Sequence, residues 1–246
     1  MSVKPEKTRE PLAFLKSLIA LLLIALCIWA AQWQFQRGID RHQRNTLIES
    51  QLTLPEEDIS KITSTSTSDI TAFEWRTVKT TGHFNSAEQI LLKNRYFEGV
   101  YGYEVLTRFK LTDGRYIWVD RGWVKAGRDA KTAPVTTLVP AGEVSLIARV
   151  RLDRSLPVGA FFALPSSGTG MISKLNAQTG FKSEGFYLDL ISGSDSSLTP
   201  AVAAQIPELS DGPHLAYSLQ WIFFAGLIIY GRILIRRGQI LTRKEL

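Results

Sequence analysis

Three side chains near residue 214 have the types and the spacing of a ligand-binding site at the start of a helix. His214, Tyr217 and Trp221 stand at positions i, i+3 and i+7, so they share one face of a helix. A neutral imidazole is a common iron ligand, and two aromatic rings can contact a flat apolar macrocycle. The spacing therefore predicts a site for a metal-bearing ligand such as a haem. The alternative is anchoring alone, because Tyr and Trp are enriched at membrane interfaces and a histidine can cap a helix.

The element that must position these side chains is the last hydrophobic stretch of the chain. Residues 215–235 contain one charged side chain, Arg232, whose long stem can reach outward. About 20 such residues are enough for a helix to cross roughly 30 Å of hydrocarbon. Pro213 suits a first helical turn and Gly212 a flexible cap. We therefore expect a transmembrane helix over 215–235 that begins at the membrane surface beside His214.

A second hydrophobic stretch covers residues 12–33 and contains only Lys16 as a charged residue. The apolar run is long for a cleaved signal peptide and no good Ala-x-Ala site closes it. We interpret it as an uncleaved transmembrane helix, with a removed signal as the alternative. Basic residues at helical spacing from Arg37 onward predict that this helix continues to about residue 52, with a bend or weak point at Gly38.

The net charge of +6 comes from the two ends of the chain. The tails, residues 1–16 and 232–246, together carry nine basic and three acidic side chains, while residues 34–214 are neutral. Lys and Arg on short flanks of membrane spans mark the cytoplasmic side, so the charge indicates topology and not a nucleic-acid surface. We expect a multi-pass protein of the bacterial cell membrane, with the tails 1–11 and 236–246 in the cytoplasm and residues 34–214 outside.

The single cysteine, Cys27, falls in the first hydrophobic stretch. The outer domain is therefore expected to have no disulfide and no thiol for redox work or copper delivery. It must be held together by its own hydrophobic core.

Between the two hydrophobic stretches, the hydrophobic period changes to two, as in β-strands. Asp113-Gly114 is a strong hairpin signal, and a short helix is expected near residues 171–179. Because no long helix alternates with the strands, the sequence predicts an extracytoplasmic, β-rich α+β domain with an antiparallel sheet or small barrel. A polar loop is expected over residues 60–69. Strands or short apolar runs are expected at residues 72–82, 89–93, 101–110, 115–124, 143–152 and 185–191.

No pattern in the chain is typical of a known enzyme. The three histidines, His42, His83 and His214, are far apart, and no zinc, Cys-x-x-Cys, nucleophile-elbow or phosphate-loop motif occurs. We expect His83 to lie on the surface at the end of a predicted strand, and His42, on the basic helix, to face water or lipid headgroups. A protein without catalytic activity is the prediction, and an extracytoplasmic enzyme with an unrecognised site is the alternative.

The segment Val119–Trp123 interrupts a hydrophobic strand with a charge. One interpretation is an Asp120–Arg121 ion pair at a strand end beside a packed Trp123. The other is an arginine that faces a propionate or an acidic partner, where its planar fork can bind a carboxylate through two hydrogen bonds. Gly122 permits a bulge or a close approach of another backbone segment.

Four segments of the chain form a recognisable set. They are Trp33-Gln34-x-x-Arg37, Gly99-x-x-Gly102-Tyr103-x-Val105, Asp120-Arg121-Gly122-Trp123 after Asp113-Gly114, and His214-Leu215-x-Tyr217-x-x-Gln220-Trp221. Together they resemble the surfeit locus 1 (Shy-type) family of cytochrome c oxidase assembly proteins. Their order, their spacing and the two-span topology agree with that family over most of the chain, although Asp120 stands where the family more often has Asn and residues 161–189 match poorly.

The resemblance implies a membrane-bound assembly factor for the haem-copper oxidase, with the catalytic subunit and other assembly factors as partners. It also implies that haem a is a transient cofactor and that His214 is its axial ligand. Tyr217 and Trp221 would contact the macrocycle, and Arg37 or Arg121 would meet its propionates. The alternative is a structural scaffold that holds the nascent oxidase subunit without binding haem.

Overall fold

The structure is a computed structural model that describes residues 12–62, 70–127, 133–152 and 170–241. The chain divides into two compact units, which are described separately here. The first contains residues up to 46 and those from 208 onward, and the second contains residues 47–207.

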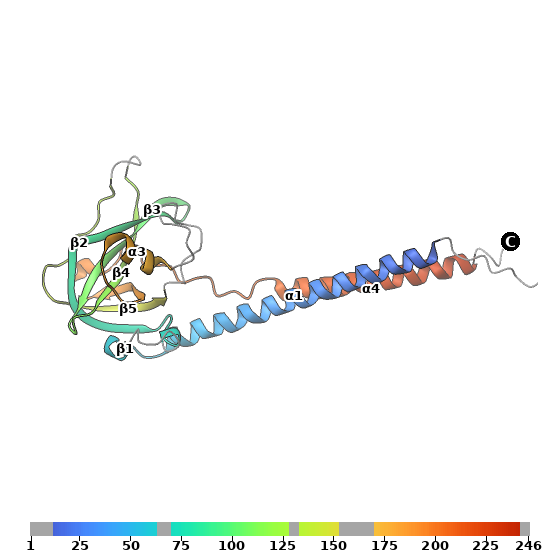
Figure 1. Cartoon of the computed structure of the whole chain (residues 1–246), viewed down its shortest axis with the longest axis horizontal. Helices are drawn as coiled ribbons and strands as arrows, with labels where there is room; N and C mark the ends of the chain where they lie inside the picture. Colours follow the sequence, from blue (N-terminus) through green and yellow to red (C-terminus); the bar gives the residue numbers. More distant parts are fainter. Residues whose placement is uncertain (1–11, 63–69, 128–132, 153–169, 242–246) are drawn as a thin grey trace, which may run out of the picture. The chain divides into compact units, whose positions relative to one another are not determined.

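The first unit is a pair of antiparallel helices. α1 spans Ala13–Thr53 and enters the second unit with its last residues, and α4 spans His214–Leu241. Figure 1 shows the two helices side by side. Both are long and apolar enough to cross a membrane, judged by length and composition. The expected continuation of the first hydrophobic stretch as one helix is confirmed, and α4 begins at the expected position.

The two helices pack through a seam that repeats every seven residues. The less exposed positions follow one another in alternating steps of four and three, which is the heptad spacing of a left-handed helix pair. Many of them are Ala, Ser or Gly, which lets the backbones approach. The seam consists of Ala13, Ser17, Ala20, Ile24, Cys27, Ala31, Gln34 and Gly38 of α1 with His214, Ser218, Trp221, Ala225, Ile228 and Arg232 of α4.

The polar side chains of the seam are hydrogen-bonded across it. Ser218 Oγ donates to the carbonyl oxygen of Ala31 at 2.9 Å. Arg232 does not reach outward as expected but turns to α1, where Nη2 donates to Ser17 Oγ at 2.9 Å and to the Ala13 carbonyl at 3.2 Å. Such bonds spare the polar groups the cost of facing hydrocarbon.

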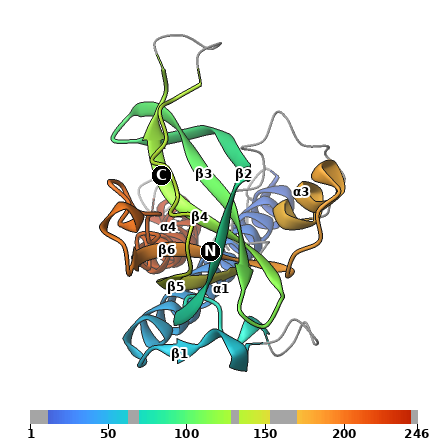
Figure 2. The ribbon, with the colours of Figure 1, turned by 90° about the vertical axis from the view of Figure 1, so that its left-hand side faces the viewer.

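The second unit is a small barrel (Figure 2). The strands pair in the order β2-β3-β4-β6-β5, and β5 returns to β2, so the sheet closes. All these pairs are antiparallel except β4 with β6, and the short β1 adds to β2 in parallel. The predicted small barrel is thereby confirmed. Its strands are β1 Glu57–Asp58, β2 Thr77–Phe97, β3 Val100–Leu111, β4 Tyr116–Lys125, β5 Val144–Leu152 and β6 Phe186–Gly193.

Alternation along the strands divides the apolar side chains into two layers. Side chains such as Val119, Val150 and Leu188 fill the barrel. On the outside, α3 (Met171–Thr179) contributes to a second cluster with Trp118 and Tyr187. The helix predicted near residues 171–179 is therefore confirmed, and its function is to cover the outer face of the strands.

The strand predicted over residues 72–82 begins later than expected, at Thr77. Trp75 has a left-handed backbone (φ +73°), and its buried ring lies under the guanidinium of Arg151, 3.7 Å from ring centroid to Cζ. The apparent alternation before Thr77 therefore belongs to a turn that places this ring. In the predicted loop 60–69, residues 59–61 form the 3₁₀ helix η1 (Ile59–Lys61), and residues 63–69 lie outside the described residues.

Candidate functional sites

His214 is held in place by a glutamine of the opposite helix. Its Nδ1 lies 2.9 Å from Oε1 of Gln34. An amide oxygen accepts hydrogen bonds, so with this partner Nδ1 carries the proton and Nε2 keeps its lone pair. A carbonyl-type oxygen on one ring nitrogen is the usual arrangement that orients a metal-ligating histidine through the other nitrogen. The seam thus holds the His214 ring with Nδ1 turned toward Gln34.

Gly38 lets the helices come close at this point. A Cβ on Gly38 would lie 3.4 Å from Cβ of His214 and 3.3 Å from Cδ2 of Leu215. The glycine lies within one continuous helix. Its function is therefore to let the start of α4 approach α1 closely enough for Gln34 to reach the imidazole.

The other predicted ligand contacts of the first unit lie on the same two helices. Trp221 is half-buried in the seam, two turns after His214, whereas Tyr217 is 47% exposed. Arg37 is exposed and lies over the ring of Trp33, with 5.1 Å from Cζ to the ring centroid. The seam therefore contains His214, Gln34 and Trp221, of which the first two are in contact, while Tyr217 and Arg37 are exposed on their helices.

The segment before α4 is also tied to α1. His42 Nδ1 lies 2.9 Å from Oδ2 of Asp211, and Asn45 Nδ2 donates to Oδ1 of the same carboxylate at 3.1 Å. The bond to His42 is the main reason that the pKa of Asp211 is below its ordinary value. His42 is exposed as predicted, but its bond to Asp211 was not foreseen. His83 is exposed too, within β2 and not at its end.

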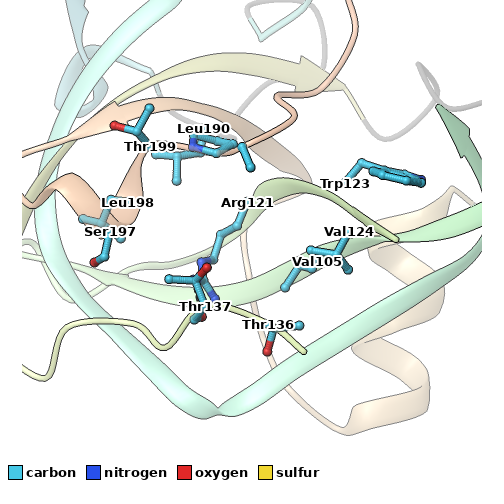
Figure 3. Close-up of a pocket in the computed structure, with 12 residues that line it drawn as sticks. Val105, Arg121, Trp123, Val124, Thr136, Thr137, Leu190, Ser197, Leu198 and Thr199 are labelled. Carbon is cyan, nitrogen blue, oxygen red and sulfur yellow. Dashed lines mark hydrogen bonds between the residues drawn. The ribbon is translucent and has the colours of Figure 1, made fainter. Parts of the chain in front are cut away.

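The segment Val119–Trp123 lies in β4 of the barrel unit, so Arg121 and His214 belong to different units. Arg121 is half-buried, and its Nη1 donates to Gln89 Oε1 at 3.1 Å and its Nη2 to the Thr137 carbonyl at 2.6 Å. Burial lowers the pKa of Arg121. Figure 3 shows its side chain in a small, partly open hollow, next to Thr137.

The Asp120–Arg121 ion pair considered above is not formed. Successive side chains of a strand point to opposite faces, so the two residues lie on different sides of β4. The carboxylate of Asp120 accepts a hydrogen bond from the backbone N–H of Gly122 at 2.8 Å. The packed tryptophan is confirmed, since Trp123 Nε1 donates to the Arg95 carbonyl at 3.2 Å.

Gly122 permits the close approach of another backbone segment, as predicted from the sequence. Its φ is +91°, and a Cβ there would lie 2.3 Å from the Val202 carbonyl oxygen and 2.9 Å from Cβ of Pro200. The next residue, Trp123, donates its N–H to that same carbonyl at 2.8 Å. The glycine therefore fixes the segment around residue 200 against β4, where it forms one wall of the hollow.

Asp120 belongs to a buried ionic cluster on the outer face of the barrel. It stands opposite Asp189 of β6 in the parallel β4–β6 pair, and the two are 3% and 1% exposed. Arg151 binds Asp189 at 2.5 Å, and Arg95 binds Glu104 at 2.6 Å. Loss of hydration, with the charges of Glu104 and Asp189 next, raises the pKa of Asp120 well above its ordinary value.

An Asp120→Asn variant is expected to be more stable than the parent chain at neutral and alkaline pH. Since the folded-state pKa of Asp120 is raised, the stability of the parent falls as the pH rises through it. Asparagine keeps the acceptor for Gly122 without the charge, so we expect a gain on the order of 1 kcal/mol at pH 8 that shrinks in acid. Denaturant unfolding of the detergent-solubilised chain at pH 5 and pH 8 measures it.

Asp113→Asn is the matched control with the opposite sign. The hydrogen bond from Arg115 lowers the pKa of Asp113, so its contribution is present at neutral pH and is lost as the pH falls. A stability difference between Asp120→Asn and the parent chain that is the same at both pH values would contradict the buried charge.

Comparison with known proteins agrees with these features. The sequence model of the SURF1 family matches residues 21–226 of the chain. Uncharacterized SURF1-like proteins of Mycobacterium bovis and of two strains of Mycobacterium tuberculosis are each 29% identical over 239 residues, which is 90% of this chain and 86% of theirs.

Proposed function

The chain belongs to the SURF1 family, which is associated with cytochrome c oxidase assembly, and from that premise we propose that it binds haem a through His214 and assists its insertion into the catalytic subunit of the oxidase. The observation that carries the haem step is the bond between Nδ1 of His214 and Oε1 of Gln34 at 2.9 Å. It leaves the lone pair of Nε2 available to a metal, on a helix pair with an apolar surface. This is the arrangement that a transient iron ligand needs.

The residues of the helix pair fit a haem in their chemistry. A bound haem would supply an iron that a single imidazole can hold. His214 would hold the iron, and Gln34 would keep the imidazole in the required tautomer and orientation. Trp221 and Tyr217 would offer flat apolar contacts, and Arg37 a cation for a propionate. Arg121 is not needed for this proposal.

Membrane anchoring is part of the proposal. The two apolar helices and their basic flanks support a hairpin with both termini in the cytoplasm and the barrel outside the cell membrane. The internally satisfied polar groups of the seam, at Ser218 and Arg232, suit an apolar surrounding. The proposed partners, the catalytic subunit and other assembly factors, act in the same bilayer.

Optical spectroscopy tests the haem step. We expect the full chain, purified in detergent from cells that make haem a, to show a Soret band. His214→Ala should remove the ligand and with it most of the band, whereas Gln34→Leu should weaken haem affinity by about 10 to 100-fold by releasing the imidazole. Gln34→Glu, which keeps an acceptor oxygen, should retain the band.

His42→Ala is the matched control, because it also removes an imidazole, one that ties α1 to the segment before α4, but leaves His214 and Gln34 in place. Its band should equal that of the parent chain. A Soret band unchanged in His214→Ala would remove His214 as the ligand. A parent chain that co-purifies with the oxidase subunit without any band would favour the scaffold function.

A further inference from the structure

Arg121 differs from the other buried or half-buried arginines of the barrel unit whose pairing is described. Arg95 binds Glu104, Arg108 binds Glu88 and Arg151 binds Asp189, at 2.5 to 2.8 Å. Arg76 and Arg115 also form ion pairs with carboxylates, and the charge of Asp189 acts on Arg149. Among the residues that the structure describes, Arg121 forms no ion pair. Its hydrogen bonds go to two neutral oxygens, of Gln89 and of the Thr137 backbone.

A guanidinium that is half-buried without a counter-charge is costly to the fold. Withdrawal from water disfavours the charged form, and loss of hydration lowers the pKa of Arg121, with no carboxylate among the described residues opposing it. Two neutral acceptors satisfy two of its five N–H groups, and its Nε is buried without a hydrogen-bond partner. The side chain thus has both charge and hydrogen-bonding capacity left for an anion.

The hollow beside Arg121 is lined for a carboxylate on a short apolar stem. Figure 3 shows hydroxyl-bearing and aliphatic side chains around the guanidinium. The hydroxyls can bind the oxygens of an anion and the aliphatic wall can contact methylene groups. The hydroxyls belong to Thr136, Thr137, Ser197 and Thr199, and the aliphatic wall to Val105, Leu190, Leu198 and Pro200.

The rim of the hollow favours a polypeptide over a free anion. The loop that contributes Thr136 and Thr137 also presents Val135 and Leu138 to solvent, 95% and 83% exposed. Two aliphatic side chains exposed to that degree lie beside an arginine that has no ion pair within the described part of the chain. This is the pattern of an interaction surface, in which an arginine anchor is surrounded by apolar contacts that exclude water. A free carboxylate would make no use of them.

We propose that this hollow, defined by Arg121 and the loop Val135–Leu138, is the docking point for an aspartate or glutamate side chain in an apolar segment of a partner polypeptide. The identification of that partner as the oxidase catalytic subunit rests on the proposed function. The guanidinium recognises the carboxylate, and Val135 and Leu138 contact the aliphatic residues next to it. Charge complementarity sets the choice of partner.

Photo-crosslinking of the full chain tests the proposal. A p-benzoylphenylalanine at Leu138, in cells that co-express the catalytic subunit, should crosslink to that subunit, and mass spectrometry should place the crosslink within a few residues of an Asp or Glu. Arg121→Gln should lower the yield about tenfold, the effect of losing one charge-assisted contact. Arg121→Glu combined with replacement of that acidic residue by Arg should restore the yield, which only a folded variant can do.

Two control variants separate docking at Arg121 from a general loss of positive charge and from haem binding. Lys110→Gln removes one exposed positive charge of the same unit and should leave the yield unchanged. His214→Ala tests haem binding and should leave the yield unchanged as well. The docking proposal is overturned by a yield that Arg121→Gln does not change, by a crosslinked segment without an acidic residue, or by the absence of any crosslink to the subunit. It is also overturned if Arg121→Gln changes only the Soret band, because the carboxylate is then a haem propionate.

Discussion

Replacement of Arg151 by Met is expected to destabilise the barrel unit by about 3 to 5 kcal/mol, the usual cost of leaving one member of a buried ion pair without its partner. Arg151 is buried, and its Nη1 lies 2.5 Å from Oδ2 of Asp189, which is 1% exposed. Methionine can still cover the ring of Trp75, over which the guanidinium lies. It leaves the carboxylate of Asp189 without its cation and next to Asp120. Denaturant unfolding of the detergent-solubilised chain gives the free energy of unfolding directly.

The loss should depend on pH in a defined direction. Burial already raises the pKa of Asp189, and Arg151 is the main influence that opposes this rise. Without the arginine the folded-state pKa rises further, so the stability of the variant falls as the pH increases through it. The difference between parent and variant should therefore be larger at pH 8 than at pH 5.

The ion pair of Lys61 with Glu57 provides the comparison. Its atoms are 2.6 Å apart, almost the distance in the buried pair, but the lysine side chain is 68% exposed. Lys61→Met is expected to cost less than about 1 kcal/mol, because water screens an exposed pair. A similar small loss for Arg151→Met would show that the buried cluster of Asp120 and Asp189 does not need the cation.

Local patterns predicted much of the fold. The alternation of residues 144–152, the Asp113-Gly114 turn and the helix over residues 171–179 each depend on neighbours along the chain, and the structure has them close to the expected bounds. Residues 72–76 show the limit of this approach. Their alternation resembles a strand, but the burial of Trp75 under Arg151, a contact across 76 positions of sequence, determines a turn.

The candidate sites were less predictable because their partners are distant in sequence. Gln34 and His214 lie 180 residues apart, and Asp120 faces Asp189 only because β4 and β6 run parallel. The packing face of the helix pair is marked in the sequence, but the hydrophobicity of the residues does not reveal it. In a stretch that is apolar on all sides, only the recurrence of small residues such as Ala31 and Gly38 marks the face that packs.

The Arg121 hollow also requires tertiary information. A sequence shows that an arginine interrupts a strand, but not whether a carboxylate from another strand meets it. Arg151 and Arg121 look alike along the chain, since each interrupts a strand that is otherwise largely apolar. The structure separates them, because Asp189 meets the first and neutral oxygens meet the second. The difference assigns the first to stability and leaves the second available to a partner.

Gly122→Ala is expected to destabilise the barrel unit by about 2 to 5 kcal/mol, from two separate costs. A left-handed backbone costs an alanine about 1 to 2 kcal/mol, and an added methyl group in a filled space costs about 1 to 3 kcal/mol more. At Gly122 both apply, because φ is +91° and the new Cβ would lie 2.3 Å from the Val202 carbonyl oxygen. Denaturant unfolding measures the sum.

Gly114→Ala isolates the first cost. Gly114 has nearly the same φ, +89°, but a Cβ there would meet no atom within 4 Å. We expect a loss of only about 1 to 2 kcal/mol, so the excess in Gly122→Ala measures the contact between β4 and the segment around Val202. Equal losses in the two variants would mean that this segment moves away freely. Because that segment forms a wall of the hollow beside Arg121, the excess also measures how firmly the proposed docking point is held in shape before a partner arrives.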